Sequence, residues 1–175
     1  TADFLARAAT GQADDLLSAV LLATESPLLL VPAMNDPMWA HGQTQRNVKH
    51  LRELGSKILE PESGDLAAGE GAGPGRMPEP ETIFAHVGRL LEPESPIAGR
   101  RVVLTAGATR EPIDPVRFIS NHSRGKMGAA LAASAWRRGA DVVLVAGAMT
   151  VQPPVGVATH AVETTEQMAQ EVEQQ

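Results

Sequence analysis

Residues 101–105 read RVVLT and residues 141–145 read DVVLV, and these two aliphatic runs decide the fold. Continuous runs of this kind are typical of parallel strands that are buried on both faces. Between them, residues 123–138 predict a helix that ends at Gly139, and its apolar face is expected to carry Met127, Ala130, Leu131, Ala135 and Trp136. A strand, a crossover helix and a second strand form a right-handed unit of a parallel sheet.

The same alternation continues towards the end of the chain. Residues 157–162 predict a third strand, and Thr164 opens a last helix with Gln167 as its capping-box partner. Residues 106–121, which leave the first strand, are expected to form a long irregular loop.

The first half of the chain also alternates between helices and strands. Helices are expected over residues 1–8, 13–24, 38–54 and 81–91, strands over 28–31 and 57–59, and a glycine- and proline-rich loop over 60–80. Gly55 is expected to close the third of these helices. This order predicts an α/β fold.

A polar segment with two prolines, residues 92–99, separates the halves and is typical of a linker. We therefore expect a first domain over residues 1–92, a linker over 93–100 and a second domain over 101–175. Because both ends interrupt an α/β pattern, and a three-stranded sheet would leave aliphatic surface wet, we expect the chain to be part of a longer polypeptide.

Composition excludes several classes of protein. Among 175 residues, 43% are hydrophobic and 21% charged, as in ordinary globular domains, and the net charge is −6, which argues against a nucleic-acid binder. There is no cysteine, so disulfides and thiolate metal sites are excluded. No apolar run is long enough to span a membrane and no secretory signal is visible, so we expect a cytoplasmic protein with no membrane partner.

Two nucleotide-binding fingerprints are absent. The turn after RVVLT reads Ala106-Gly107-Ala108-Thr109 rather than G-x-G-x-x-G, and Gly125-Lys126 lacks the context of a Walker A loop. Residues 120–128 (SNHSRGKMG) nevertheless combine a predicted helix entrance with two cations, which favours phosphate binding. The alternative is that Ser123 is only a helix cap and that the cations are solvated.

Three further segments have both a functional and a structural interpretation. Asp114 could face a cleft or pair with Arg110 or Arg117, and the ion pair is favoured on structural grounds. Asn35, after the strand at 28–31, can bind a carboxylate or amide. Otherwise residues 32–39 form a turn with Asp36 as cap and Trp39 in the core. The loop at 64–80 has the length of a flap or of a plain connection.

The five histidines show no metal-like pair on a helix face, so no metal site made of side chains is expected; Mg²⁺ carried by a nucleotide stays possible.

Together these motifs resemble one family. Residues 32–39 (PAMNDPMW) look like the substrate-recognition motif of flavin-dependent cysteine decarboxylases, and Thr1-Ala2-Asp3 with residues 11–18 looks like the end of their flavin-binding region. Residues 66–80 look like their substrate clamp. Residues 104–128 are similar to the opening of phosphopantothenate–cysteine ligase. In this order they resemble the bifunctional phosphopantothenoylcysteine decarboxylase/phosphopantothenate–cysteine ligases of coenzyme A synthesis.

The resemblance implies two partial Rossmann-like or flavodoxin-like parallel-sheet domains and two activities. In the ligase, CTP with Mg²⁺ activates 4′-phosphopantothenate as an acyl-cytidylate that cysteine attacks. Asn121 would orient this intermediate, while nucleotide and substrate would be bound by Gly107, Thr109, Asp114, Arg117, Ser123, Gly125 and Lys126. The decarboxylase then uses FMN to convert phosphopantothenoylcysteine to 4′-phosphopantetheine.

In that decarboxylase half, Asn35 would recognise the substrate and Thr1, Ala2 and Asp3 would bind the flavin. The clamp would comprise Ala68, Gly69, Gly75, Arg76 and Met77. The partners implied are these small molecules and further copies of the chain in a homo-oligomer.

Several positions depart from the family pattern. Ala68 replaces the clamp cysteine, Asp3 replaces an asparagine, and Arg124 replaces a serine. The family's first flavin-binding strands and its catalytic histidine would precede Thr1, and the ligase lysines would follow Gln175, so the chain alone is expected to complete neither reaction. The loss of the clamp cysteine motivates a second hypothesis, a non-catalytic flavin-binding regulatory scaffold. A third is a generic Rossmann-like reductase.

Overall fold

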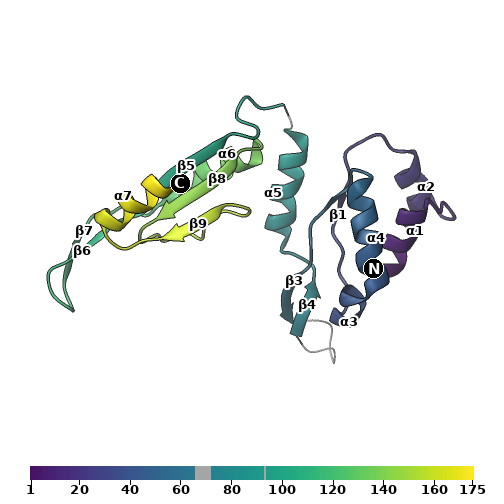
Figure 1. Cartoon of the computed structure of the whole chain (residues 1–175), viewed down its shortest axis with the longest axis horizontal. Helices are drawn as coiled ribbons and strands as arrows, with labels where there is room; N and C mark the ends of the chain where they lie inside the picture. The colour runs from purple at the N-terminus through teal and green to yellow at the C-terminus, as the bar shows by residue number, and fades with distance from the viewer. Residues whose placement is uncertain (66–71, 93) are drawn as a thin grey trace. The chain divides into compact units, whose positions relative to one another are not determined.

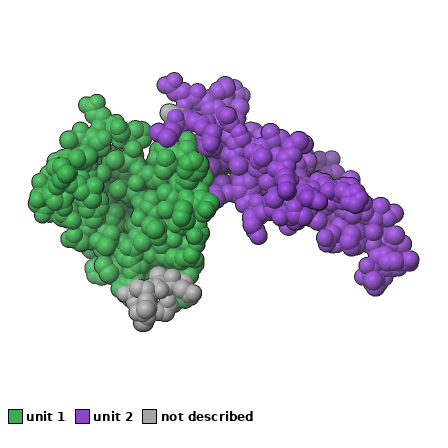
Figure 2. Space-filling model, turned by 180° about the vertical axis from the view of Figure 1, so that it is seen from behind, with its two compact units in different colours: residues 1–90 green, residues 91–175 purple. Residues whose placement is uncertain are grey.

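A computed structural model describes residues 1–65, 72–92 and 94–175. The chain divides into two compact units, Thr1–Leu90 and Leu91–Gln175, which Figure 2 distinguishes by colour. Each unit combines helices with parallel strands, so the predicted α/β fold class is confirmed.

Unit 1 is built around a small helical core. Its elements in chain order are α1 (Ala2–Thr10), α2 (Leu16–Ala23), β1 (Leu29–Leu30), α3 (Asp36–Ala40), α4 (Gly42–Glu53), β2 (Lys57–Ile58), β3 (Glu62–Asp65), β4 (Ala72–Arg76) and α5 (Pro80–Leu91). Strand β1 pairs in parallel with β2. Leu5 and Ala9 of α1 are buried against Val48 and Leu51 of α4, with Trp39 packed beside them.

Three expectations for unit 1 are corrected. The single helix expected over 38–54 is two, because His41 is extended and its Nδ1 accepts a hydrogen bond from the Gln43 amide at 3.1 Å, which starts α4. The helix expected from residue 13 begins at Leu16, because Asp15 and Ser18 form a capping box. Its apolar side chains are largely exposed, Leu16 at 82%.

The third correction concerns the predicted loop over residues 60–80. It contains an antiparallel hairpin, β3–β4, in which Ser63 pairs with Pro74 and Gly64 with Gly73. Glycine and proline disfavour strands by intrinsic propensity, so the pattern indicated a loop. The hairpin forms because Gly75 approaches the residues after β1, and its carbonyl accepts a hydrogen bond from the Met34 amide at 3.0 Å.

Unit 2 is built around a three-stranded parallel sheet. Its elements are β5 (Arg101–Ala106), β6 (Arg110–Pro112), β7 (Phe118–Ser120), α6 (Lys126–Arg137), β8 (Asp141–Ala146), β9 (Ala158–Ala161) and α7 (Thr165–Gln174). The sheet order is β5-β8-β9 with both pairs parallel, and Leu104 lies opposite Leu144. Figure 1 shows β8 between its two neighbours and the β6–β7 hairpin projecting at one end of this unit.

The three strands of unit 2 and the presence of a crossover helix match the sequence expectation, while the connection between β5 and that helix does not. Strand β8 is almost wholly buried, with Val142, Leu144 and Val145 at 2% exposure or less. The expected loop over 106–121 contains the hairpin β6–β7, in which Arg110 pairs with Ser120. The capping box of Thr164 and Gln167 at the start of α7 is confirmed.

The start and the buried face of α6 also differ from expectation. The helix begins at Lys126, after Gly125, rather than at Ser123. Met127 and Leu131 are exposed, at 78% and 51%, whereas Ala129, Ala132 and Trp136 are buried. The small residues face the sheet because α6 lies very close to β5: a Cβ atom on Gly128 would lie 2.5 Å from the Ala106 Cβ.

This close contact gives a stability prediction. The substitution Gly128→Ala is expected to destabilise unit 2 by about 1–3 kcal/mol, because the added methyl overlaps the end of β5 and forces the helix outward. Gly42→Ala, at the first residue of α4 with nothing within 4 Å of its added methyl, is the control and should be neutral or slightly stabilising. Urea unfolding of variants that keep only Trp39 or only Trp136 measures each unit; equal stabilities for Gly128→Ala and the parent would contradict the packing argument.

Candidate functional site

A crevice in unit 2 opens where β5 ends and α6 begins. Its volume is about 290 Å³, and its lining residues are Thr105, Ala106, Gly107, Ser123, Arg124, Gly125, Lys126, Met127, Gly128 and Met168. The carboxyl ends of parallel strands are where α/β proteins bind ligands. The structure therefore brings Gly107, Ser123, Gly125 and Lys126 to one place.

Two glycines let the backbone pass close to the neighbouring loop in this crevice. Gly107 and Gly125 have φ angles of 85° and 72°, a region that residues with side chains rarely adopt. A Cβ on Gly107 would lie 2.7 Å from the Ala148 carbonyl oxygen, and one on Gly125 would lie 2.5 Å from Met149 Cγ. Any side chain at either position would therefore strain the backbone and push away residues 147–149.

The crevice offers positive potential to a ligand. Gly125 caps α6 and has no side chain to accept hydrogen bonds from the first turn, so those N–H groups and the helix dipole are left for an anion. The interpretation of Ser123 as the cap is wrong. Arg124 and Lys126 are exposed, and neither makes a salt bridge within the described residues.

Asn121 lies just before the crevice and shapes its entrance. Its Oδ1 accepts a hydrogen bond from the Ser123 amide at 2.8 Å, which sets the turn that brings Ser123 to the lining. Asn121 itself is exposed and is not among the lining residues.

Three other predicted residues lie outside the crevice, in or beside the β6–β7 hairpin. Asp114 pairs with Arg117 at 2.7 Å, so the ion-pair interpretation is confirmed. The Arg117 side chain and the amides of Val116 and Arg117 hold the pKa of Asp114 below its usual range. Thr109 lies beside α7, with its Oγ1 3.1 Å from that of Thr165. Their part in ligand binding stays a prediction.

The sequence analysis did not single out Glu111 or Met168. Glu111 Oε1 accepts hydrogen bonds from the Thr165 amide at 2.9 Å and from its hydroxyl at 2.7 Å. These bonds, the hydroxyl's first, lower the pKa of Glu111. Met168 lies one helical turn further along α7 and reaches the crevice. Glu111 and Thr165 are 54 residues apart, and Met168 is at least 40 residues (168 − 128) from the other lining residues, so no local pattern points to either contact.

A second candidate site lies in unit 1, where residues 32–39 follow β1. Asn35 caps α3, its Oδ1 accepting a hydrogen bond from the Met38 amide at 3.1 Å. The cap is therefore Asn35 and not Asp36, while Trp39 packs against the core as expected. The hairpin lies against this turn: a Cβ on Gly75 would lie 2.0 Å from the Met34 carbonyl oxygen, and one on Gly73 would lie 3.2 Å from the Asp36 side chain.

The structure thus brings Asn35 and Gly75 together. Beyond Gly75, Arg76 forms an ion pair with Glu79, and Met77 is 52% exposed. Ala68 and Gly69, the other predicted clamp residues, lie outside the described residues.

Thr1, Ala2 and Asp3 stand at the start of α1, where Thr1 is the cap and makes no side-chain hydrogen bond to the first turn. Asp3 pairs with Arg7 at 3.2 Å. Arg7 also contacts Asp14 at 3.1 Å and Asp15 at 2.6 Å, and these carboxylates raise its pKa. Within the described part of the chain, no hydrogen bond or salt bridge joins residues 1–3 to Asn35.

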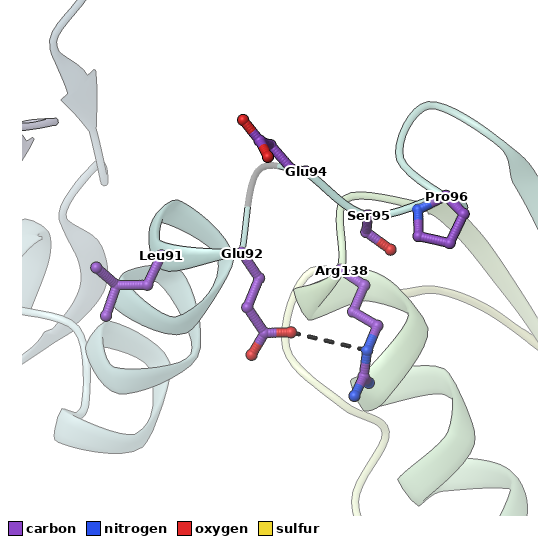
Figure 3. Close-up of a pocket in the computed structure, with 6 residues that line it drawn as sticks. All are labelled: Leu91, Glu92, Glu94, Ser95, Pro96 and Arg138. Atoms are coloured by element: carbon purple, nitrogen blue, oxygen red, sulfur yellow. Dashed lines mark ion pairs between the residues drawn. The ribbon is translucent and has the colours of Figure 1, made fainter.

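A larger pocket of about 490 Å³ in unit 2 contains none of the predicted site residues. Figure 3 shows its lining: Leu91, Glu92, Glu94, Ser95, Pro96 and Arg138. Glu92 pairs with Arg137 at 2.8 Å and with Arg138 at 3.7 Å. Because Arg138, the cation in this lining, is already paired with Glu92, the described residues give this pocket no unpaired positive charge like that of the crevice.

Two negative findings apply to the described residues. They contain no group of three or more histidine, cysteine, aspartate or glutamate side chains that could hold a metal ion. None of their helices has both the length and the apolar character needed to cross a membrane.

Both halves of the chain match known families. Residues 1–92, more than half of the chain, match the family described as Flavoprotein, and residues 97–175 match the DNA/pantothenate metabolism flavoprotein C-terminal domain. The coenzyme A biosynthesis bifunctional protein CoaBC of Mycobacterium tuberculosis (strain H37Rv) is 49% identical over 177 residues, which cover 98% of this chain and 42% of that protein. The corresponding protein of Escherichia coli K12 is 47% identical over 88% of this chain and 38% of its own length.

The chain therefore spans about two fifths of the length of these curated relatives. Among solved structures, the C-terminal domain of a CoaBC bifunctional protein shares 49% identity over 45% of this chain and 40% of its own, with a TM-score of 0.44. A PPC decarboxylase mutant complexed with pantothenoylaminoethenethiol shares 36% identity over 49% of this chain and 48% of its own, with a TM-score of 0.47.

The acidic cluster around Arg7 predicts a pH dependence of stability. The Ser18 amide and hydroxyl, followed by Arg7, lower the pKa of Asp15 from 3.8 to about 2. A carboxyl with a lowered folded-state pKa contributes stability above its unfolded-state pKa and loses it as the pH falls through its folded-state value. Between pH 4 and pH 2, roughly, the parent should therefore lose more thermal stability than Asp15→Asn. Glu25→Gln, which alters a carboxylate outside this cluster, should follow the parent; identical acid profiles for Asp15→Asn and the parent would contradict the assignment.

Proposed function

The chain belongs to the Flavoprotein family, and we propose that it works in coenzyme A biosynthesis, with unit 1 serving an FMN-dependent decarboxylation and unit 2 a CTP-dependent ligation. The matches to both family descriptions and the two bifunctional relatives support this proposal. The observation that carries the ligase part is the crevice at the end of β5, which collects a helix start without a side-chain cap and two cations that form no salt bridge with any described residue.

The crevice suits a phosphorylated ligand. A triphosphate or phosphopantothenate group placed there would meet the first-turn amides of α6, with Lys126 and Arg124 on either side of Gly125. The net charge of the chain, −6, does not by itself oppose this, because both carboxylates of the segment between β5 and α6 are already engaged: Asp114 with Arg117 and Glu111 with Thr165.

The proposed ligase reaction has two steps. The carboxylate of 4′-phosphopantothenate attacks the α-phosphorus of CTP, and pyrophosphate leaves as the acyl-cytidylate forms. The amine of cysteine then attacks the acyl carbon, the amide bond forms and CMP leaves. Asn121 is the residue expected to orient the acyl-cytidylate, through the amide group that stands at the entrance of the crevice.

Mg²⁺ would come with the nucleotide. The described residues gather no set of carboxylates that could bind the ion alone, and Mg²⁺ in phosphoryl chemistry is often held mainly by phosphate oxygens.

In unit 1 the residues fit a flavin phosphate in part. The uncapped first turn of α1 favours an anion, whereas the Asp3 carboxylate opposes one and is offset by Arg7 at 3.2 Å. FMN, when bound, would supply the redox chemistry of the decarboxylation. Asn35, already fixed as the cap of α3 through its Oδ1, would use its Nδ2 amide to bind the substrate's carboxylate end against the hairpin at Gly75.

The remaining parts of the proposal follow from this chemistry. The partners are the small molecules of the two reactions, and the expected location is the cytoplasm. Further copies of the chain are expected to complete a homo-oligomer. Clamp chemistry at Ala68 would lack the thiol that the family pattern supplies.

The ligase proposal predicts two separable losses in the full-length protein that contains this chain. Asn121→Asp should lower pyrophosphate release about 100-fold, because a carboxylate replaces the group that orients the intermediate. Lys126→Ala should raise the KM for CTP about tenfold through loss of one charged contact to phosphate. Pyrophosphate release with CTP, phosphopantothenate and cysteine measures both.

Lys49→Ala is the control for these variants, because Lys49 is an exposed lysine in unit 1 whose partner, Glu53, lies on its own helix. It should leave both constants unchanged. Absence of pyrophosphate release from the unaltered protein, or an Asn121→Asp variant indistinguishable from it, would overturn the ligase assignment.

The flavin proposal predicts an increase in affinity. Asp3→Asn should tighten FMN binding about threefold to tenfold, because removing one carboxylate near the phosphate removes about 1 kcal/mol of repulsion. Asp14→Asn, which also removes a carboxylate partner of Arg7 but lies after α1, should leave the affinity unchanged. Fluorescence titration of the apoprotein with FMN tests this, and weaker binding by Asp3→Asn would show that the carboxylate does not face the phosphate.

A further inference from the structure

The lining of the crevice in unit 2 comes from three separate segments of the chain. Gly107 follows β5, Ser123 precedes α6, and Met168 lies on α7. Between Gly107 and Ser123 the chain forms the β6–β7 hairpin, which is a separate two-stranded sheet rather than part of the central one. Asn121 directly follows β7, so the position of the hairpin sets the position of Asn121.

One carboxylate joins this hairpin to α7. Glu111, in the middle of β6, accepts hydrogen bonds from both the amide and the hydroxyl of Thr165, the first residue of α7. Around this contact, the Arg110 amide donates to the Glu163 carbonyl at 2.7 Å. We call the contact between Glu111 and Thr165 the hairpin latch.

Further hydrogen bonds connect the hairpin latch to both ends of the β6–β7 hairpin. The Thr165 hydroxyl lies 3.1 Å from that of Thr109, and the Thr109 carbonyl accepts a hydrogen bond from the Ser120 hydroxyl at 2.7 Å. Ser120 is the residue before Asn121. Hydrogen bonds among Glu111, Thr165, Thr109 and Ser120 therefore connect α7 to the segment that enters the crevice, the last of them through the Thr109 backbone carbonyl.

The charge on Glu111 suits this place. An ionised carboxylate is favourable beside the amino end of a helix, and the hydrogen bonds from Thr165 hold the pKa of Glu111 below its usual range. Helix α6, in contrast, is fixed by its packing on β5 and β8 through Gly128, Ala129 and Ala132, and does not depend on the latch.

We propose that Glu111 is a positioning residue for the ligase reaction: by latching the β6–β7 hairpin to α7, it holds Asn121 at the entrance of the crevice. The role of Asn121 rests on the proposed function; the latch itself rests only on the contacts just described. Because α6 is anchored separately, loss of the latch should impair the step that needs Asn121 more than the binding of the nucleotide.

The test is a double-mutant cycle in the full-length protein. Glu111→Ala should lower kcat for pyrophosphate release about tenfold while the KM for CTP stays within about twofold. In an Asn121→Ala background the same change should cost less than about twofold, because its effect passes through Asn121. Glu111→Gln keeps an oxygen that accepts from Thr165 and should recover most of the rate.

Glu166→Ala is the matched control, because Glu166 is the next residue of α7, is also acidic, and among the described residues accepts a side-chain hydrogen bond from Gln170 alone, at 3.4 Å. It should leave kcat unchanged. Equal losses from Glu111→Ala with and without Asn121 would show a general destabilisation and overturn the proposal, as would a KM effect without a kcat effect.

A second readout needs no activity. Hydrogen exchange of the Thr165 amide should be about tenfold faster in Glu111→Ala than in the unaltered protein and unchanged in Glu166→Ala. Unchanged protection in Glu111→Ala would overturn the latch whatever the kinetics show. If the unaltered protein releases no pyrophosphate but the Thr165 amide loses protection as expected, the proposed function and the positioning role fall while the latch stands.

Discussion

The arrangement of unit 2 depends on how closely α6 lies against the end of β5. A Cβ on Gly128 would fall within 2.5 Å of Ala106 and 3.0 Å of the Thr105 carbonyl, so no side chain separates helix from strand there. The close approach places the first turn of α6 directly above the carboxyl end of the strand. The crevice, its uncapped amides and its two cations all follow from that placement, because a helix one methyl group further out would leave its dipole away from the sheet edge.

The elements that could be predicted are those whose sequence pattern is local and strong. The strands at β5 and β8, the stop at Gly139 and the capping box of α7 each depend on a few adjacent residues. The two missed hairpins do not. Strand β4 reads AGPGR and β6 reads REP, sequences with little intrinsic preference for a strand, and both form because another segment offers contacts: Met34 in one case and Glu163 with Thr165 in the other.

The candidate sites show the same division. Gly107, Ser123, Gly125 and Lys126 could be predicted to meet because strand ends and following helix starts share one sheet edge. Whether Asp114 faced a cleft or a cation could not be settled in this way, since the answer depends on the side-chain direction inside a hairpin that the sequence did not reveal. The roles of Met168 and Glu111 could not be predicted from the sequence, because their contacts join residues far apart in the chain.

Local charge, rather than net charge, governs what the crevice can attract. The chain carries an excess of six acidic residues, yet both carboxylates of the segment between β5 and α6 are occupied, Asp114 by an arginine and Glu111 by helix-start donors. Arg124 and Lys126 are left without such partners among the described residues, on either side of a cap glycine that has no side chain to accept hydrogen bonds from the first turn. An anion entering the crevice therefore meets positive potential from three sources at once, which an overall count of charges would not reveal.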